Sequence, residues 1–318
     1  MDSVWSATLE EQRPYLVYTP PSYGDTTVAP QRYLTPTHAE TDPSGEPSAA
    51  FASSGGGPRF LSFVRDELIP RIESRYRTLP YRVFVGHSFG GITTLSALYT
   101  MPETFNAYVA IDPSLWWDGR TLLTQAKDYF QTARLEGRTL YVAHANTMGP
   151  DTAANVHSQS IAQFNEVMKA YDRSGIRYAF RYYGDDDHGS VPLIAEYDAL
   201  RFIFDGYRVP LQRVVDRPAV LTEHFRGVSE RMGVDFKPSE GTLRLFTQLM
   251  MAQDTAKAIE FGEMRAALYP DSWRAMVFLG DVWAAKGDVP KARKYLETAL
   301  AMSGGRPQVQ ERLDKLGR

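Results

Sequence analysis

The pentapeptide Gly86-His87-Ser88-Phe89-Gly90 constrains this chain more than any other feature of its sequence. A β-rich run, 81–85, comes directly before it, and a helical run, 92–99, follows it. In a Gly-x-Ser-x-Gly pattern with these flanks, the serine lies on a tight turn from strand to helix, where the glycines leave room for the backbone. The turn forces the serine into a strained conformation that presents its hydroxyl group. We therefore expect Ser88 to be a nucleophile.

The rest of the first two thirds of the chain alternates between strand and helix patterns. Apolar and β-branched runs predict further strands over 105–111, 139–143 and 177–183, and amphipathic runs predict helices over 161–171 and 193–204. This alternation is typical of a mostly parallel sheet covered on both faces. The strand-to-helix turn around Ser88 is called the nucleophile elbow. Upstream of the elbow, the patterns predict a strand over 13–19, a long irregular loop over 23–58, and a helix over 60–76 that Pro70 kinks or divides.

Strand patterns end after Pro210. Residues 241–270 and 273–304 align at an offset of 34 residues, and the second copy has Leu279-Gly280 and Ala292 at tetratricopeptide spacing. The sequence predicts an all-α helical-repeat tail, and a plain helical bundle is the alternative. We expect a catalytic domain over 1–209 and a helical, tetratricopeptide-like domain over 210–318.

A serine hydroxyl needs a base, and the chain has six histidines. His188 follows the last predicted strand and precedes the closing helix, which is where the base belongs when the serine comes first along the chain. His144 is second choice, because it ends a strand. We expect His87 to point away from Ser88, and His38, His157 and His224 to have no catalytic part.

The acid that orients the histidine is less clearly marked. The chain order Ser-Asp-His favours Asp151, the first carboxylate after the strand over 139–143. Asp112 is the rival, although an Asp before Pro113-Ser114 more commonly caps a turn. A Ser–His pair without an acid is the third alternative.

Two further features complete the predicted site. The backbone N–H of Phe89, at the start of the helix, should face the developing oxyanion. Trp116 and Trp117 could wall a substrate pocket, and core packing of one with exposure of the other is an equal alternative. We predict no metal site and no cofactor.

Composition excludes several classes of protein. The chain has no cysteine, which rules out disulfides and thiolate chemistry. Its net charge of −3 without a dense basic block argues against a nucleic-acid partner, and no run is long and apolar enough to span a membrane. The sequence as written predicts a cytoplasmic protein, or a periplasmic or secreted one if a leader has been removed.

Several motifs together resemble the putative-esterase family of α/β-hydrolases, which includes siderophore esterases and S-formylglutathione hydrolases. The resemblance covers roughly the first two thirds of the chain and rests on four segments: Leu34–Thr37, Val83–Gly91, Ile111–Trp117 and His188–Leu193. It implies hydrolysis of esters or thioesters without a cofactor, with Ser88 as nucleophile and His188 as base. Some members of this family also resemble this chain in having a tetratricopeptide-like tail.

The chain departs from that family between the opening hairpin and Leu34–Thr37. A strand-helix-strand unit of about 30 residues or more is absent there, and in the family its first strand borders the elbow strand. An α/β-hydrolase sheet shortened in this way would leave the edge of 81–85 exposed. Either the N-terminal hairpin moves across to pair there, or two chains meet at this edge as a homodimer. Gly55-Gly56-Gly57 could replace the oxyanion N–H group lost with the unit.

These features predict a serine carboxylic-ester hydrolase that acts on small or short-acyl esters through a Ser-His-Asp triad, with a small-molecule ester as its partner. The alternative is a catalytically weakened hydrolase scaffold that binds or assembles other proteins through its helical tail.

Overall fold

The computed structural model describes residues 2–6, 11–15, 34–41, 46–76, 78–147 and 155–317. The chain divides into two compact units, Met1–Ile203 and Phe204–Arg318. Each unit is described by itself.

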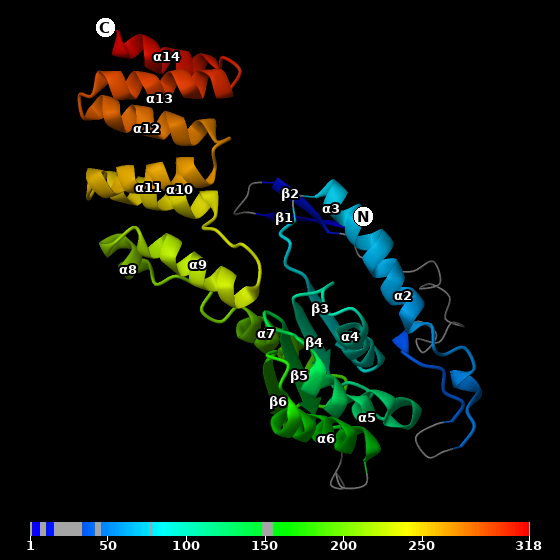
Figure 1. Ribbon diagram of the computed structural model, residues 1–318. Coiled ribbons are helices and arrows are strands. Elements are labelled where there is room, and N and C mark those ends of the chain that lie inside the picture. The colour runs from blue at the N-terminus through cyan, green and yellow to red at the C-terminus, as the bar shows by residue number, and fades with distance from the viewer. Residues whose placement is uncertain are drawn as a thin grey trace. The chain divides into compact units, whose positions relative to one another are not determined.

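The first unit is built on a parallel four-stranded sheet (Figure 1). Its strands are β3 (Val83–His87), β4 (Ala107–Ile111), β5 (Thr139–Ala145) and β6 (Arg177–Tyr183), and they lie side by side in the order β3-β4-β5-β6. In this register Ile111 pairs with both His87 and Ala143, so the carboxyl ends of β3, β4 and β5 meet at one edge. The predicted parallel sheet is confirmed, and the functional residues gather at this edge.

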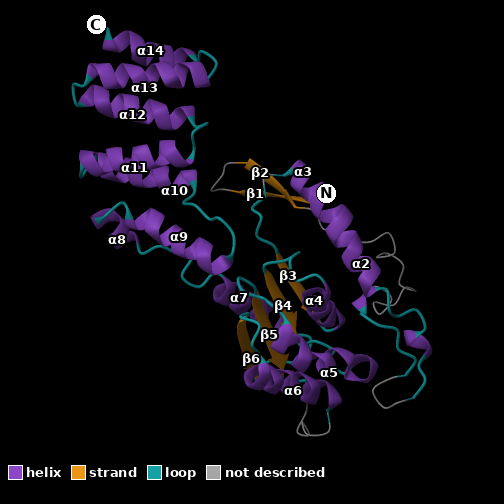
Figure 2. Cartoon of the chain, viewed as in Figure 1, coloured by secondary structure: helices purple, strands orange, loops and turns teal. Residues whose placement is uncertain are grey.

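Helices cover both faces of the sheet. Each of the first three strands is followed by a crossover helix, namely α4 (Phe89–Thr100), α5 (Trp117–Thr132) and α6 (Val156–Tyr171). Because parallel crossovers are right-handed and the strand order runs in one direction, these three helices lie on the same face. Helix α7 (Val191–Ile203) packs on the other face, against β4 and β5 (Figure 2). Strands β4 and β5, covered from both sides, are buried at every residue.

The N-terminal hairpin does not extend this sheet. Strands β1 (Asp2–Ser6) and β2 (Glu11–Tyr15) pair with each other in a separate antiparallel sheet. The strand predicted over 13–19 thus lies earlier, and 16–19 are outside the described residues. Within the described ranges β3 pairs only with β4, so the sheet ends at the elbow strand and the hairpin does not cover its edge.

The segment before the elbow is helical, interrupted by a π-helical turn. A short 3₁₀ turn, η1 (Ala49–Phe51), precedes α2 (Gly57–Phe63), the π-helical η2 (Val64–Leu68) and α3 (Ile69–Arg75). Pro70 has no N–H group and its ring crowds the carbonyl group one turn earlier, so the wider turn just before it relieves the conflict. The predicted division of the helix at Pro70 takes this form.

The second unit is entirely helical over its described residues. Its helices are α8 (Leu211–Asp216), α9 (Val220–Met232), α10 (Glu240–Met251), α11 (Thr255–Leu268), α12 (Trp273–Ala285), α13 (Val289–Met302) and α14 (Pro307–Leu316). Consecutive helices from α10 onward pack against each other, and α10–α11 and α12–α13 form the largest contacts. A Cβ atom on Gly280 would lie 2.6 Å from Leu296, so glycine is needed there for the close approach of α12 and α13. The tetratricopeptide assignment itself stays a prediction.

None of the helices in the described parts of the chain combines the length and the apolar character needed to cross a membrane.

Candidate active site

The turn at Ser88 has the backbone of a nucleophile elbow. Strand β3 ends at His87, helix α4 begins at Phe89, and Ser88 between them has φ 58° and ψ −116°. A positive φ is uncommon for a residue with a side chain, so it marks a strained position of the kind that functional sites retain. Two backbone hydrogen bonds hold the turn: Ser88 N–H donates to the Ile111 carbonyl oxygen at 3.0 Å, and Ser114 N–H donates to the Ser88 carbonyl oxygen at 3.1 Å.

The glycines around Ser88 differ in whether the space around them requires glycine. A Cβ atom on Gly86 would lie 2.0 Å from the carbonyl oxygen of Gly90, and one on Gly91 would lie 2.9 Å from Pro113. A Cβ atom on Gly90 would meet nothing within 4 Å. Lack of space therefore explains Gly86, as the motif predicts, but not Gly90, where the steric expectation is wrong.

Asp112 is the carboxylate that contacts His188. It follows the last residue of β4, is fully buried, and has φ 41°, which Asp tolerates better than most side chains. Its Oδ2 lies 2.6 Å from His188 Nδ1, and its Oδ1 accepts a hydrogen bond from Ala145 N–H at 2.9 Å. The backbone of β5 thus fixes the carboxylate, and the carboxylate fixes the histidine.

Asp112 is ionised despite its burial. Burial raises the pKa of a carboxyl group, but hydrogen bonds from His157 and His188 outweigh it and hold the pKa of Asp112 well below its usual value. A negative charge therefore lies beside His188.

A second histidine shares this carboxylate. His157 Nε2 lies 3.0 Å from Asp112 Oδ2. His157 stands in the first turn of α6 because Asn155 caps that helix, with its side-chain oxygen accepting hydrogen bonds from the N–H groups of His157 and Ser158. No functional part was predicted for His157, since nothing in a helix start reveals which carboxylate the fold brings to it.

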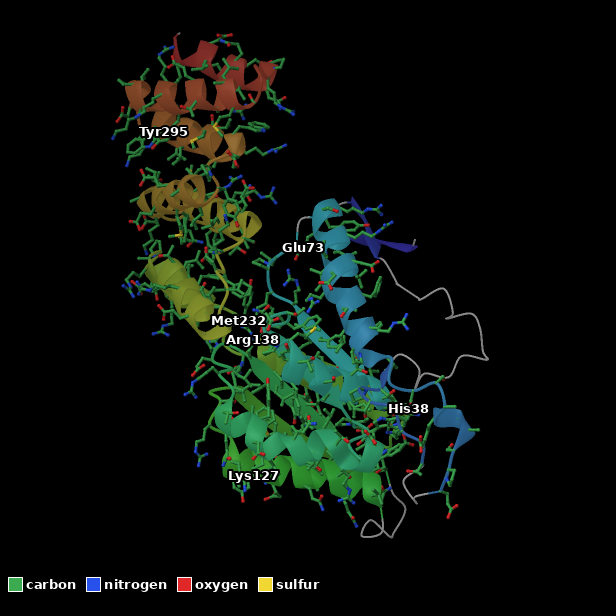
Figure 3. All side chains as sticks on the ribbon, turned by 45° about the vertical axis from the view of Figure 1, so that its right-hand side comes forward. His38, Glu73, Lys127, Arg138, Met232 and Tyr295 are labelled. Carbon is green, nitrogen blue, oxygen red and sulfur yellow. The ribbon has the colours of Figure 1, made fainter. Side chains whose placement is uncertain are left out.

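Two more histidines lie close by. The ring of His87 is 4.4 Å from that of His188, measured between centroids, and burial, followed by the charge of His188, lowers the pKa of His87. His144 Nε2 pairs with Ser158 Oγ at 2.7 Å, and burial lowers the pKa of His144 as well. His38 is exposed and pairs instead with Ser54 Oγ, in the segment before α2 (Figure 3).

The hydroxyl of Ser88 faces another hydroxyl. Ser88 Oγ lies 3.3 Å from Ser114 Oγ, and among the described residues no hydrogen bond joins Ser88 to His188. Ser88 and His188 are nevertheless neighbours. The ring of His188 contacts the ring of His87, and His188 bonds to Asp112, which lies in the sequence between the two residues that hold the Ser88 backbone. Ser114, which was not among the predicted site residues, is buried beside the elbow.

The other predicted site residues are Asp151 and the two tryptophans. Asp151 lies outside the described residues. Trp117 is buried, and its indole N–H donates to the Thr37 carbonyl oxygen at 3.1 Å. Trp116 is half-buried and packs on the ring of Phe89, the residue that opens α4. A narrow recess beside Ser114 is lined by Pro36, Ile92, Leu115, Trp117 and Leu122.

Two of the three glycines considered as oxyanion donors have other partners. Gly55 N–H donates to Thr35 Oγ1 at 2.7 Å, and Gly57 N–H donates to the Thr35 carbonyl oxygen at 2.9 Å. These contacts fix the segment before α2 and leave neither N–H group available to a ligand. The first N–H groups of α4, in contrast, have no partner within their own helix.

The parallel sheet, the elbow after β3 and the histidine after β6 define an α/β-hydrolase. Comparisons with known proteins identify the family within the α/β-hydrolases. Residues 38–188 match the family described as "Putative esterase". An IroE-like serine hydrolase from Shewanella oneidensis has a similar structure, with a TM-score of 0.67 and 30% sequence identity over 76% of this chain and 77% of that chain. The chain belongs to the putative-esterase family of α/β-hydrolases.

Curated relatives match over shorter stretches. A siderophore triacetylfusarinine C esterase of Aspergillus fumigatus is 35% identical over 83 residues, which is 26% of this chain and 28% of the relative. A siderophore enterobactin esterase of Emericella nidulans is 32% identical over 124 residues, 37% of this chain and 38% of the relative. The chain thus matches well under half of the length of either relative.

Proposed function

We propose that this chain is a serine carboxylic-ester hydrolase for small or short-acyl esters, with Ser88 as nucleophile, His188 as base and Asp112 as the acid. The observation that carries the proposal is the bond of His188 Nδ1 to the buried, ionised Asp112, next to a serine in the elbow conformation. In this proposal Asp112, whose carboxylate contacts His188, takes the part that chain order assigned to Asp151.

The proposed reaction follows from this geometry. The bond to Asp112 keeps the His188 proton on Nδ1, so Nε2 has a lone pair with which to accept the Ser88 proton. The Ser88 oxygen then bonds to the ester carbonyl carbon, and His188 returns the proton to the departing alcohol. Water repeats the sequence on the acyl-enzyme, which releases the acid and restores Ser88. Asp112 stabilises the transient imidazolium by its charge.

The Ser88 hydroxyl must turn before it can react. It faces Ser114 Oγ, and rotation about χ1 moves Oγ between staggered positions without moving the backbone. Catalytic hydrogen bonds are often long or absent without substrate and shorten in the complex. Ser114 would then remain as a hydroxyl partner beside the nucleophile.

Oxyanion stabilisation rests on the start of α4. We propose Phe89 N–H as the donor, assisted by the positive end of the helix. Since Gly55 and Gly57 donate to Thr35, neither supplies the second donor. Loss of one donor costs roughly a hundred- to a thousandfold in turnover, so we expect a preference for esters with good leaving groups.

The substrate class follows from the same surroundings. Trp116, half-buried against Phe89, is our candidate for the wall of the acyl site, while Trp117 mainly anchors the segment at Thr37. The recess beside Ser114 has no room for an acyl group, so the proposed short-acyl preference rests on Trp116. The names of the curated relatives add siderophore esters as a class to test.

We also propose that a second copy of the chain covers the outer edge of β3. Within the described ranges no strand pairs there, and the side chain of Val85 in this strand is exposed. A dimer measured by light scattering during gel filtration, and its loss in Val85→Lys, are the expected results. A monomer at all concentrations would refute this part.

The test of the function is hydrolysis of p-nitrophenyl acetate, butyrate and octanoate by the wild type, Ser88→Ala and Ser114→Ala. We expect hydrolysis to disappear in Ser88→Ala, to persist in Ser114→Ala, and to fall as the acyl chain lengthens. Equal rates in the wild type and Ser88→Ala would refute the proposal. Siderophore esters can be tested in the same way, with product analysis by mass spectrometry.

A further inference from the structure

The Asp112 carboxylate holds one histidine more than an acyl-transfer triad needs. His188 Nδ1 and His157 Nε2 approach the same oxygen, Oδ2, at 2.6 Å and 3.0 Å. The proposed reaction uses only the first of these contacts. His157 is therefore an additional imidazole whose bond helps keep Asp112 ionised but which takes part in no proton transfer of the proposed reaction.

The three atoms have the chemistry and spacing of a cation site. Asp112 Oδ2, His157 Nε2 and His188 Nδ1 all lie within 4.8 Å of one another. Two imidazole nitrogens and a carboxylate oxygen suit Zn²⁺, which takes such ligands at about 2.0–2.2 Å in a tetrahedron. Ligand atoms at those distances stand roughly 3.3 Å apart. To reach that spacing, the contact of Asp112 with His188 would need to lengthen by about 0.7 Å and its contact with His157 by about 0.3 Å.

The surroundings support a bound cation. Asp112 Oδ1 stays bonded to Ala145 N–H, which orients the carboxylate from behind, as ligand carboxylates in metal sites require. The side chains of His157 and His188 are 15% and 42% exposed, so one side of the cluster is open to solvent and to a fourth, water ligand. The acidic run 185–187 directly before His188 adds negative potential that attracts cations.

We propose that Asp112, His157 and His188 form an inhibitory site for Zn²⁺. A cation on His188 Nδ1 displaces the ring proton to Nε2, so Nε2 has no lone pair with which to accept the Ser88 proton. The same cation removes Asp112 from its orienting task. His157 is the residue that distinguishes this site from an ordinary triad, since without it only two protein ligands remain.

Binding can be tested without catalysis, whereas inhibition rests on the proposed function. Titration calorimetry of Zn²⁺ into the full-length Ser88→Ala protein should show one site with micromolar affinity. Adding His157→Gln, which keeps an N–H group for Asp112, should weaken binding by at least about tenfold, as His188→Gln should. His38→Gln, which removes an exposed histidine elsewhere, is the matched control and should bind as before. Thermal melts verify that each variant is folded.

Inhibition is measured on the Ser88-containing proteins with p-nitrophenyl butyrate, each compared with its own metal-free rate. Zn²⁺ should inhibit the wild type and His38→Gln, chelation should restore the rate, and Mg²⁺ should have no effect. His157→Gln should resist Zn²⁺. Absence of Zn²⁺ binding, or binding that is unchanged in both His157→Gln and His188→Gln, would overturn the site. If the wild type hydrolyses no ester, the function fails and the calorimetry still decides the site.

Discussion

Asp112→Asn is the substitution whose effect the structure predicts most sharply. Asp112 is fully buried, and its Oδ2 accepts a hydrogen bond from His188 Nδ1 at 2.6 Å, short as expected of a bond to a charged carboxylate. Asparagine preserves the shape and can still accept from Ala145 N–H through its carbonyl oxygen. The amide would then present its NH₂ group to both histidines, which favours the tautomer of His188 with the proton on Nε2.

The size of the loss follows from that change. In serine proteases the same substitution lowers turnover by about 10⁴, which corresponds to about 5.4 kcal/mol at 1.36 kcal/mol per tenfold. We expect a loss of about 10³ to 10⁴ in kcat, with little change in KM, because the missing charge acts mainly in the transition state. The fold should lose about 1–3 kcal/mol for the weakened buried hydrogen bonds.

The assay is steady-state hydrolysis of p-nitrophenyl acetate by the wild type, Asp112→Asn and Asp151→Asn, with thermal melts as a control for folding. Asp151→Asn should remain close to the wild type. A folded Asp112→Asn protein within tenfold of wild-type activity, together with a large loss in Asp151→Asn, would refute our assignment and restore the chain-order prediction.

Three further expectations follow from single contacts. Gly86→Ala should destabilise the first unit by at least about 3 kcal/mol, because its Cβ atom would lie 2.0 Å from a backbone oxygen. Gly90→Ala, where a Cβ atom meets open space, should cost less than about 1 kcal/mol. Equal losses of stability in urea unfolding would contradict this. Arg265→Ala should lower the free energy of unfolding of the second unit by about 2–3 kcal/mol, since this buried arginine pairs with the half-exposed Glu240 at 2.6 Å. Ester hydrolysis should be unaffected. An unchanged melting curve would show that the pair does not stabilise the fold. Burial raises the pKa of Asp112, but the hydrogen bonds of Asp112 lower its pKa by more than burial raises it. The contribution of Asp112 to the free energy of unfolding should therefore be complete above about pH 4 and be lost below it. A stability difference between the wild type and Asp112→Asn that already declines between pH 7 and 5 would contradict this.

Much of the framework was predictable because it depends on local pattern. The strand predicted over 177–183 matches β6, and the elbow motif predicts the positive φ of Ser88. Over the described residues the sheet ends at β3, as the missing strand-helix-strand unit predicts. Each of these features depends on residues that are near one another in the sequence.

The site was less predictable, because its contacts join distant segments. The sequence around Asp112 fits a turn-capping aspartate as well as a triad acid. The register of β4 and β5 distinguishes the two, because it brings Ala145 N–H to Asp112 Oδ1. His157 had no signal in the sequence, since it reaches Asp112 across 45 positions from the start of α6. Asp112 and His157 meet because the carboxyl ends of neighbouring parallel strands, and the helices that follow them, converge at one edge of the sheet.

Covalent labelling of the nucleophile tests the central claim most directly. A fluorophosphonate bonds to a serine oxygen only when a neighbouring base activates it, and mass spectrometry of the digested protein identifies the modified residue. We predict a single adduct on Ser88 in the wild type and slow or absent labelling in His188→Gln, with no adduct in Ser88→Ala. A folded wild-type protein that forms no adduct, or forms it on another residue, would contradict the account.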